Sequence, residues 1–535
     1  MREKKRGILG GVAMLATAGL LVKVTGVLYK IPLTYLLGDE GMGYFNAAYT
    51  IYSWLYMLST AGFPIALSIL ISEAESKGAY EKVRSLQSLA FFLLSAIGIL
   101  GSLAMVIFAP QLASIVGTRD AVESIRAIAP ALFFICITSL FRGIFQGYRN
   151  MAPSALSQLI ESLGKVGFGL AFAYYGASRG APLYSISALA ILGVSVGTAA
   201  GTLYLLIRYL VARHRDELSI RQAKREAFFS KNNRDLFGRM IGISIPVTIG
   251  ASVMALTTLV DLAMMIRRLQ TIGYSTAEAT ALYGNYTALV VPMFNLPTIL
   301  ITPIASGIIP ALSSAQARGD TEKKADILKN TFRIVAAISI PCALGMCFLS
   351  RPILGLLYPP SSVESAYTLL STVSPAVYFL AILTVTNAVL QATGHQRLSM
   401  WGMFLGAISK VAIGYILLGL PNVGILGAPL GTVTCYLVAL VFSLVSLAKT
   451  SRYVIPFGDL VARPLLAALG GVGAAALVYR ELFYMWGRVY GILSTIVLAI
   501  LLYGVCSLSF GVFSPSDLKP MLCALRKKDK AKQKI

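Results

Sequence analysis

The sequence contains little charge, few acidic side chains and almost no histidine. Only 13% of its 535 residues are charged and 56% are hydrophobic, whereas soluble domains carry roughly 25% charge. Two histidines and six cysteines without a CxxC spacing provide no metal motif and no disulfide framework. This composition excludes an ordinary water-soluble domain, and we predict neither a metal site nor a tightly bound cofactor.

Long hydrophobic runs recur from one end of the chain to the other. Each has about 18 residues or more, which is enough to cross a bilayer. Backbone groups inside a bilayer must find hydrogen-bond partners within their own segment, so such runs form helices. The predicted fold class is therefore an all-α polytopic membrane protein with about fourteen transmembrane helices. The predicted spans are 8–37, 44–72, 85–109, 124–146, 153–176, 186–208, 240–266, 283–310, 330–350, 366–392, 399–419, 424–447, 460–479 and 489–511.

The formal net charge is +23, which in a soluble protein would suggest nucleic acid. Of the 46 Lys and Arg residues, 32 fall in segments on the same predicted side as the N-terminus, 8 fall on the other side and 6 lie within spans. Cytoplasmic loops carry such an excess of basic residues. We therefore place both termini in the cytoplasm and predict contact with membrane lipids and no nucleic-acid partner. We also expect the protein to act as a monomer.

An internal repeat relates the two halves of the chain. Three residue types recur in the same order and at the same spacing: Pro130, Gln146 and Lys165 in the first half, and Pro375, Gln391 and Lys410 in the second. Both copies begin with an odd-numbered span, so the repeat is parallel. Parallel repeats predict two lobes of six helices, related by an axis along the membrane normal, as in transporters.

The repeat also predicts how the chain is divided. We expect an N-lobe of spans one to six (1–212), a cytoplasmic basic linker (213–238), a C-lobe of spans seven to twelve (239–450), the additional spans thirteen and fourteen (451–512), and a basic cytoplasmic tail (513–535). The linker and the tail could contact anionic lipids, although solvated loops are the more common explanation of such charge.

Ionisable side chains within the spans are the candidate site residues, because they are costly there. The acidic members are Glu161 and Asp261, and the basic members are Lys23, Lys30, Arg142, Lys165 and Lys410. The sixth basic residue within a span, Arg333, is near the start of its span, and we assign it to the membrane interface. Lys23 and Lys30 are seven residues apart and share a helix face. Glu161 and Lys165 are four apart, and we predict that they form a structural ion pair. Asp261 either balances a lysine or binds a coupling cation.

The excess of positive charge predicts an anionic ligand. Buried cations that outnumber the acids are unfavourable unless an anion compensates them, and Lys and Arg are the usual partners of phosphate. A pyrophosphate group fits this excess, and a cationic drug does not. For Lys30 and Arg142, positions near the membrane interface remain an alternative. The aromatic run 44–56 suits sugar stacking, but we favour an interface belt.

Three segments resemble a known family. They are 23–32 (KVTGVLYKIP), 38–44 (GDEGMGY) and 141–153 (FRGIFQGYRNMAP). These resemble the stage V sporulation protein B and MurJ-type lipid II flippases of the multidrug/oligosaccharidyl-lipid/polysaccharide superfamily. The resemblance extends over nearly the whole chain.

The resemblance implies a two-lobe, fourteen-helix fold with a cationic cavity and alternating access, in the cytoplasmic membrane of a bacterium. The implied activity is translocation of an undecaprenyl-diphosphate-linked saccharide, with lipid II as the first candidate. Lys23 and Lys30 are similar to basic residues of span one that would engage the diphosphate in the MurJ type. To these we add Arg142 and Lys410, from their charge within the spans, as diphosphate-binding candidates. Asp261 matches an acidic residue that helps to hold sodium in some members, and the coupling ion, Na+ or H+, stays open. Spans thirteen and fourteen would hold the lipid tail.

Two rival functions remain at this point. A cation-coupled multidrug exporter of the same fold needs buried carboxylates, and only Asp261 and Glu161 qualify. A membrane-embedded glycosyltransferase needs catalytic carboxylates at a membrane face, and Asp39 with Glu40 is the only acidic pair between the first two spans. We therefore expect a transporter and not an enzyme. Another lipid-linked polysaccharide unit is an alternative substrate.

Overall fold

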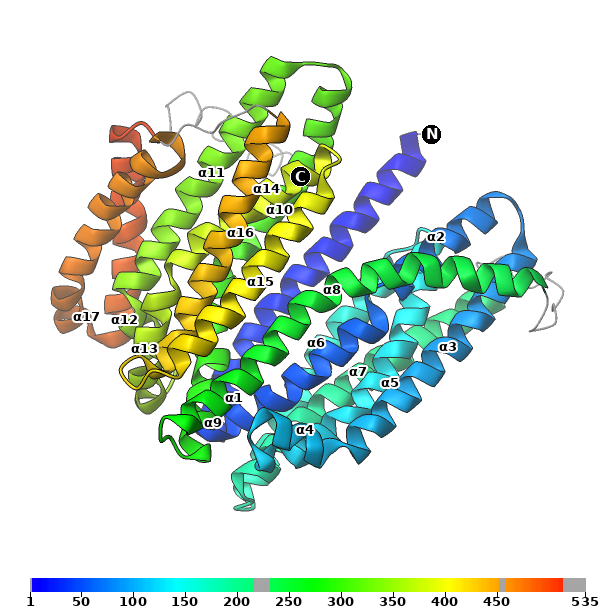
Figure 1. Cartoon of the computed structure of the whole chain (residues 1–535), viewed down its shortest axis with the longest axis horizontal. Helices are drawn as coiled ribbons and strands as arrows, with labels where there is room; N and C mark the ends of the chain where they lie inside the picture. The colour runs from blue at the N-terminus through cyan, green and yellow to red at the C-terminus, as the bar shows by residue number, and fades with distance from the viewer. Residues whose placement is uncertain (1, 216–230, 452–457, 513–535) are drawn as a thin grey trace, which may run out of the picture. The chain divides into compact units, whose positions relative to one another are not determined.

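The computed structural model describes residues 2–215, 231–451 and 458–512. Across these residues the chain forms helices and short connections, with no strand (Figure 1). This confirms the predicted all-α class. Much of the predicted basic linker (213–238) and all of the predicted tail (513–535) lie outside the described residues.

The chain divides into two compact units. The first comprises Met1–Leu289 with Gly419–Gly424, and the second comprises Val290–Leu418 with Ile425–Ile535. The helices of the first unit are α1 (Arg2–Thr60), α2 (Phe63–Ser76), α3 (Tyr80–Ile107), α4 (Ala109–Val116), η1 (Arg119–Ala121), α5 (Val122–Gly147), α6 (Ala152–Ser178), α7 (Leu183–His214), α8 (Lys231–Thr271) and α9 (Thr276–Asn285). This unit thus includes α8 and α9, which the repeat assigns to the C-lobe; the lobe boundaries themselves stay a prediction.

The second unit contains the remaining long helices. They are α10 (Val291–Ala317), α11 (Thr321–Phe348), α12 (Ser350–Leu357), α13 (Pro360–Val373), α14 (Pro375–Ala392), α15 (Gln396–Leu418), α16 (Gly427–Ser451), η4 (Gly458–Ala462) and α17 (Arg463–Ser509). The π-helical turn η2 (Tyr286–Val290) and the short helix η3 (Gly424–Leu426) lie where the chain passes between the units.

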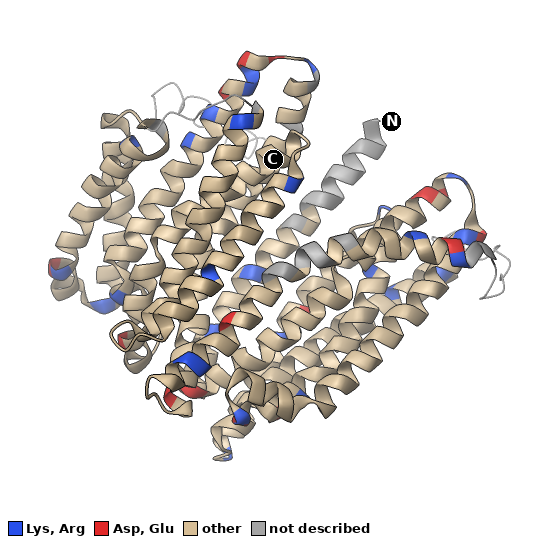
Figure 2. Ribbon diagram, viewed as in Figure 1, with Lys and Arg blue, Asp and Glu red and all other residues tan. Residues whose placement is uncertain are grey.

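Ten described segments are long and apolar enough to cross a membrane. Figure 2 shows the same property on the ribbon, because charged residues gather near helix ends and in connections while the middle of most helices carries none. The protein is therefore a multi-pass membrane protein. The ten segments do not include α6 and α8, and the count of fourteen spans stays a prediction.

Two of the ten segments, Thr17–Ser76 and Leu460–Ser509, are 60 and 50 residues long, whereas a bilayer needs about 20. Each contains a glycine with a left-handed backbone that interrupts the helix, Gly38 at φ 62° and Gly487 at φ 73°. Glycine has no Cβ and adopts this conformation without a steric cost. Gly38 therefore divides α1, and Gly487 divides α17, into two shorter helices.

Contacts across each glycine show that the chain reverses there. Lys30 contacts Asn46 through a 3.4 Å hydrogen bond, and the two residues lie equally far from Gly38 along the chain. In α17, Gly471 lies against Tyr503 and Gly491 lies against Phe483. Both of these pairs are centred on Gly487, so the segments 463–486 and 488–509 form a hairpin, visible in orange and red in Figure 1.

Each unit has its own hydrophobic core. In the first unit the core packs α2, α3 and α5 together with one end of α7 and of α8. In the second, α10, α11, α14 and α16 pack with the start of α17. The helices α6 and α7 lie beside the first core, and glycines bring their backbones unusually close. A Cβ on Gly193 of α7 would lie 2.3 Å from the Cα of Gly169 on α6.

Candidate functional site

A cavity of about 440 Å³ lies within the first unit, between both halves of α1 and helices α5 to α8. Its polar lining consists of Tyr29, Tyr49, Tyr52, Ser53, Tyr56, Arg142, Gln158, Glu161, Ser162, Lys165 and Thr198. This volume suits a small ligand or one end of a larger ligand.

A stripe of tyrosines forms one wall of the cavity. Tyr49, Tyr52 and Tyr56 are three and four residues apart on the second half of α1, so they share a face. Their ring centroids follow one another at 6.0 and 6.1 Å. Tyr29, from the first half of α1, completes this wall, and its hydroxyl donates to the carbonyl of Ala190. These rings line the cavity, so the interface belt that we favoured from sequence does not describe them.

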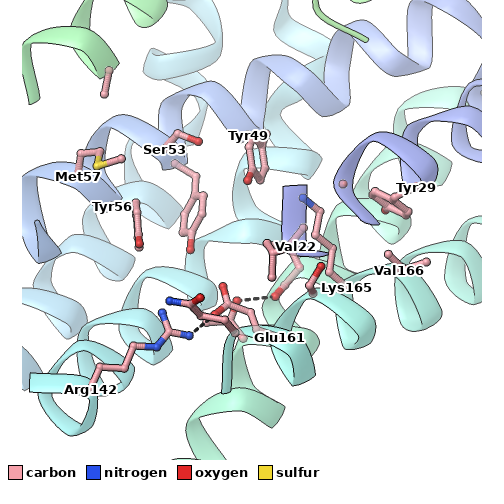
Figure 3. Close-up of a pocket in the computed structure, with 17 residues that line it drawn as sticks. Val22, Tyr29, Tyr49, Ser53, Tyr56, Met57, Arg142, Glu161, Lys165 and Val166 are labelled. Carbon is pink, nitrogen blue, oxygen red and sulfur yellow. Dashed lines mark hydrogen bonds and ion pairs between the residues drawn. The ribbon is translucent and has the colours of Figure 1, made fainter. Parts of the chain in front are cut away.

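Arg142 and Glu161 form an ion pair at one side of the cavity, as Figure 3 shows. The Arg142 Nη2 donates to Glu161 Oε2 at 2.9 Å, and its Nε donates to the hydroxyl of Ser157 at 3.0 Å. The side chains are 11% and 28% exposed, respectively. Lys165 is thus not the ion-pair partner that the structure gives to Glu161. Arg142 reaches across from α5 and occupies that place.

Lys165 instead extends toward the tyrosines (Figure 3). Its Nζ lies 4.4 Å from the ring centroid of Tyr49 and 5.6 Å from that of Tyr29. A cation over aromatic faces is stabilised by about 0.5–2 kcal/mol, depending on desolvation. Within the described part of the chain, the structure gives Lys165 no ion pair. The three charged side chains that line the cavity therefore leave one positive charge in excess.

Lys23 and Lys30 lie on the same half of α1 but do not line this cavity. Its lining takes Val22, Gly26 and Tyr29 from that helix instead. Val22 and Tyr29 each precede one of the lysines by one residue, and Gly26 lies between the lysines. One residue turns an α-helix by about 100°, so the lysines point away from the face that lines the cavity. The side chain of Lys23 is exposed, and that of Lys30 is half-buried.

The half-buried Lys30 binds the π-helical turn η2. Its Nζ donates to the carbonyl of Thr287 at 2.7 Å and to Asn46 Oδ1 at 3.4 Å. In a π-helical pattern the partner of the Thr287 carbonyl is five residues on. That residue is Pro292, which has no N–H to donate. The ammonium group therefore supplies the missing donor.

The remaining candidate residues lie on different helices. Asp261 is half-buried on α8 of the first unit, and Lys410 is half-buried on α15 of the second. Lys410 matches Lys165 in the repeat, and each lies near the middle of the first helix of a closely packed pair, α6 with α7 and α15 with α16. Their roles, like those of Lys23 and Lys30, stay predictions.

The acidic pair considered for a glycosyltransferase is engaged in structural contacts. Asp39 accepts a 3.0 Å hydrogen bond from Asn285 Nδ2, and Glu40 accepts one from the hydroxyl of Tyr44. Across residues 2–215, 231–451 and 458–512, no group of three or more His, Cys, Asp or Glu side chains is arranged to hold a metal.

The sequence predicts a phosphate-binding role for Arg142 and a structural ion pair for Glu161 and Lys165, and it does not single out Tyr29. The repeat contained a signal for Lys165, because its partner Lys410 was already a candidate for phosphate binding. Tyr29 had a weaker signal, as it lies one helical turn after Gly26 on the face that lines the cavity.

Comparison with known proteins supports the sequence resemblance. The sequence model of the polysaccharide biosynthesis protein family matches residues 8–316, and that of the MatE family matches residues 286–416. Stage V sporulation protein B of Bacillus subtilis is 24% identical over 444 residues, which cover 80% of this chain and 81% of that protein. The lipid II flippase MurJ of the same organism is 23% identical over 459 residues, 83% of each chain.

Solved structures show the same fold. A lipid II flippase MurJ in an inward closed conformation matches with a TM-score of 0.69 at 15% identity, over 93% of this chain and 98% of that one. A multidrug resistance MATE family transporter in its inward-facing conformation matches with a TM-score of 0.63, also at 15% identity, over 81% and 94%. These matches confirm the resemblance drawn from the three sequence segments.

Proposed function

Because this chain belongs to the polysaccharide biosynthesis protein family, we propose that it moves a lipid-linked saccharide across the membrane by alternating access. The first candidate substrate is lipid II, an undecaprenyl-diphosphate-linked saccharide, carried from the inner to the outer leaflet of the bacterial cytoplasmic membrane. The names of two relatives, a lipid II flippase and a stage V sporulation protein, support this substrate class and a role in cell-wall synthesis or sporulation. Transport of this kind requires no catalytic residue.

The observation that carries the proposal is Lys165, whose positive charge faces a tyrosine-lined cavity without an ion-pair partner among the described residues. Arg142 and Glu161 neutralise one another at 2.9 Å, so the net charge of the lining comes from Lys165. An ammonium group binds phosphate as a point charge. Aromatic faces beside it suit the apolar face of a sugar ring. One end of a diphosphate-linked saccharide therefore matches both features of the lining.

The other predicted residues keep their proposed roles. Lys23, Lys30 and Lys410 would bind the diphosphate, and Arg142 would join them when the substrate competes with Glu161 for its guanidinium. Asp261 would bind the coupling cation, Na+ or H+, or balance a lysine. The membrane potential, worth about 2.3 kcal/mol per charge per 100 mV, could then return the empty cationic transporter.

A multidrug exporter is the second candidate, favoured by the match of the MatE family to residues 286–416. A cationic drug needs an accessible carboxylate. In the cavity the only lining carboxylate is Glu161, which accepts a hydrogen bond from Arg142. We therefore rank drug export second. Efflux of a cationic dye from cells that express the protein, beside a vector control, separates the two candidates.

The direct test is survival of a bacterium depleted of its own lipid II flippase. Expression of this protein from a plasmid, with its membrane level checked by immunoblot, should restore growth, and Lys165→Ala should abolish the rescue. Lys165→Arg, which keeps the charge, is the matched control. Lysis despite normal membrane expression would reject lipid II as the substrate and leave other lipid-linked saccharides to be tested in proteoliposomes.

A further inference from the structure

A second cavity lies in the other unit, where α12 and α13 meet the reversal of α17. Its volume is about 610 Å³. Three arginines, Arg351, Arg480 and Arg488, line it together with one carboxylate, Glu364. None of these residues entered the sequence prediction or the transport site.

The basic side chains of this cavity are only partly compensated. Arg351 donates to Glu364 at 2.9 Å. Arg480 lies 5.9 Å from the ring centroid of Tyr484, and the Arg488 guanidinium packs against Gly355, where an added Cβ would lie 3.1 Å from its Nη2. Among the described residues, neither Arg480 nor Arg488 forms an ion pair. Arg480 and Arg488 therefore present two positive charges to the cavity, while its one carboxylate, Glu364, is paired with Arg351.

The fold brings these two arginines together. Arg480 precedes Gly487 and Arg488 follows it, so they lie on opposite halves of the hairpin close to its tip. The buried Gly355 on α12 has no side chain, and this allows the Arg488 guanidinium to pack against the α12 backbone at the cavity wall. A guanidinium group can bind two oxygens of one phosphate at once, because its N–H donors form a fork.

The surroundings of the cavity are those of a membrane surface. The hairpin is an apolar candidate span, so its tip lies at the end of two crossing segments. Met485, Trp486 and Tyr490 near this tip are 73%, 57% and 68% exposed. Exposed Trp and Tyr at the end of a span typically lie at the level of lipid headgroups. A ligand of this cavity therefore meets headgroups on one side and hydrocarbon on the other.

We propose that this cavity binds the phosphate of an anionic glycerophospholipid, such as phosphatidylglycerol, through Arg480 and Arg488. The rings of Tyr479 and Phe483, which also line the cavity, pack against the glycerol and the first part of the acyl chains. The predicted topology places the site in the outer leaflet. The ligand is a resident membrane lipid and not the transported substrate, so the site does not depend on the proposed function.

The test uses the purified full-length protein in detergent. Dioleoylphosphatidylglycerol or dioleoylphosphatidylcholine is added at increasing concentration, and the thermal unfolding midpoint is followed. We expect phosphatidylglycerol alone to raise the midpoint. Its apparent affinity should fall about fivefold for each arginine removed in Arg480→Ala, Arg488→Ala and the double variant. Arg179→Ala is the matched control, because Arg179 is also exposed and also lies over a tyrosine ring.

Several results would overturn the proposal. An equal response to phosphatidylcholine, or an unchanged response in the double variant, would remove the phosphate site. An equal shift with inorganic phosphate or glycerol 3-phosphate would show a site for free phosphate and reject the lipid. If the double variant does not elute as a single folded species, Arg488→Lys and Glu364→Gln decide. Arg488→Lys should keep most of the midpoint shift with phosphatidylglycerol, and Glu364→Gln should increase this shift because it frees Arg351. A larger shift in Arg488→Lys than in Glu364→Gln would contradict the site.

Discussion

The Nζ of Lys165 lies 4.4 Å from the ring centroid of Tyr49. Glu161, one helical turn before Lys165 on α6, is occupied by Arg142 from α5. The lysine is therefore held by a wall of tyrosines and not by the nearest carboxylate of its own helix. This relationship makes Lys165 the side chain through which the cavity can attract an anion.

Replacing Lys165 should weaken transport more than folding. A hydrogen bond from an ammonium group to a charged ligand contributes about 1.5–3 kcal/mol, so Lys165→Ala should reduce the affinity for a diphosphate-linked substrate by about 10- to 100-fold. Binding of the substrate to the purified protein measures this. Lys165→Arg should retain most of the affinity, and the unfolding midpoints of both variants should stay close to that of the wild type. Equal affinity in Lys165→Ala and wild type would rule out this role.

The Arg142–Glu161 pair should be coupled in a double-mutant cycle. Glu161→Gln leaves the Arg142 guanidinium, only 11% exposed, without its carboxylate, and we expect a loss of about 1–3 kcal/mol in the free energy of unfolding. Adding Arg142→Gln should recover part of this loss, because the unpaired charge is then removed. Urea or thermal unfolding of the four proteins in detergent measures the coupling. Additive losses would show that the two side chains act independently.

Two glycines of neighbouring helices should respond in opposite ways to alanine. In Gly193→Ala the new Cβ would meet the backbone of Gly169 at 2.3 Å, and forced repacking costs about 1–3 kcal/mol. Gly167→Ala on α6 meets nothing within 4 Å, so the better helix propensity of alanine should leave stability unchanged or raise it by up to about 1 kcal/mol. Thermal unfolding of both variants is the measurement. A destabilised Gly167→Ala beside a neutral Gly193→Ala would contradict the packing.

The two functions of Lys30, charge and hydrogen-bond donor, can be separated by substitution. Lys30→Gln keeps an N–H donor, on a side chain one bond shorter, for the Thr287 carbonyl, so we expect most of the folding stability to be retained while transport falls. Lys30→Met removes the donor and should cost about 1–3 kcal/mol of unfolding free energy as well. Growth rescue and unfolding are measured for both variants. Full transport by Lys30→Gln would assign this residue a structural role alone.

The helices themselves could be predicted, because a hydrophobic run of this length in a bilayer satisfies its backbone hydrogen bonds by forming a helix. The break at Gly38 also falls between the predicted spans 8–37 and 44–72, and glycine at that point is a physical signal for a turn. The reversal at Gly487 likewise falls between the predicted spans 460–479 and 489–511. In both places one residue type marks the backbone conformation.

The partners of the charged residues could not be predicted in the same way. Glu161 and Lys165 satisfy the four-residue spacing of a helical ion pair, but spacing along one helix does not show what a neighbouring helix offers. Arg142 lies 19 positions before Glu161 and meets it through packing of α5 against α6. The sequence predicts a membrane-interface belt for Tyr49, Tyr52 and Tyr56, which line the cavity instead. A helical face has the same sequence pattern whether it meets a cavity or a membrane surface.

The close approach of α6 and α7 has a consequence for how the cavity can change shape. Gly164 lies against Gly197, and Gly169 lies against Gly193, with their backbones in contact. Neither helix can slide past the other without a clash or a void, so the wall that carries Glu161 and Lys165 is stiff. The opposite wall belongs to α1, whose two halves join at the single residue Gly38. We therefore expect Tyr49, Tyr52 and Tyr56, on the second half of α1, to move relative to Lys165 during transport, while Lys165 keeps its position on the stiff wall.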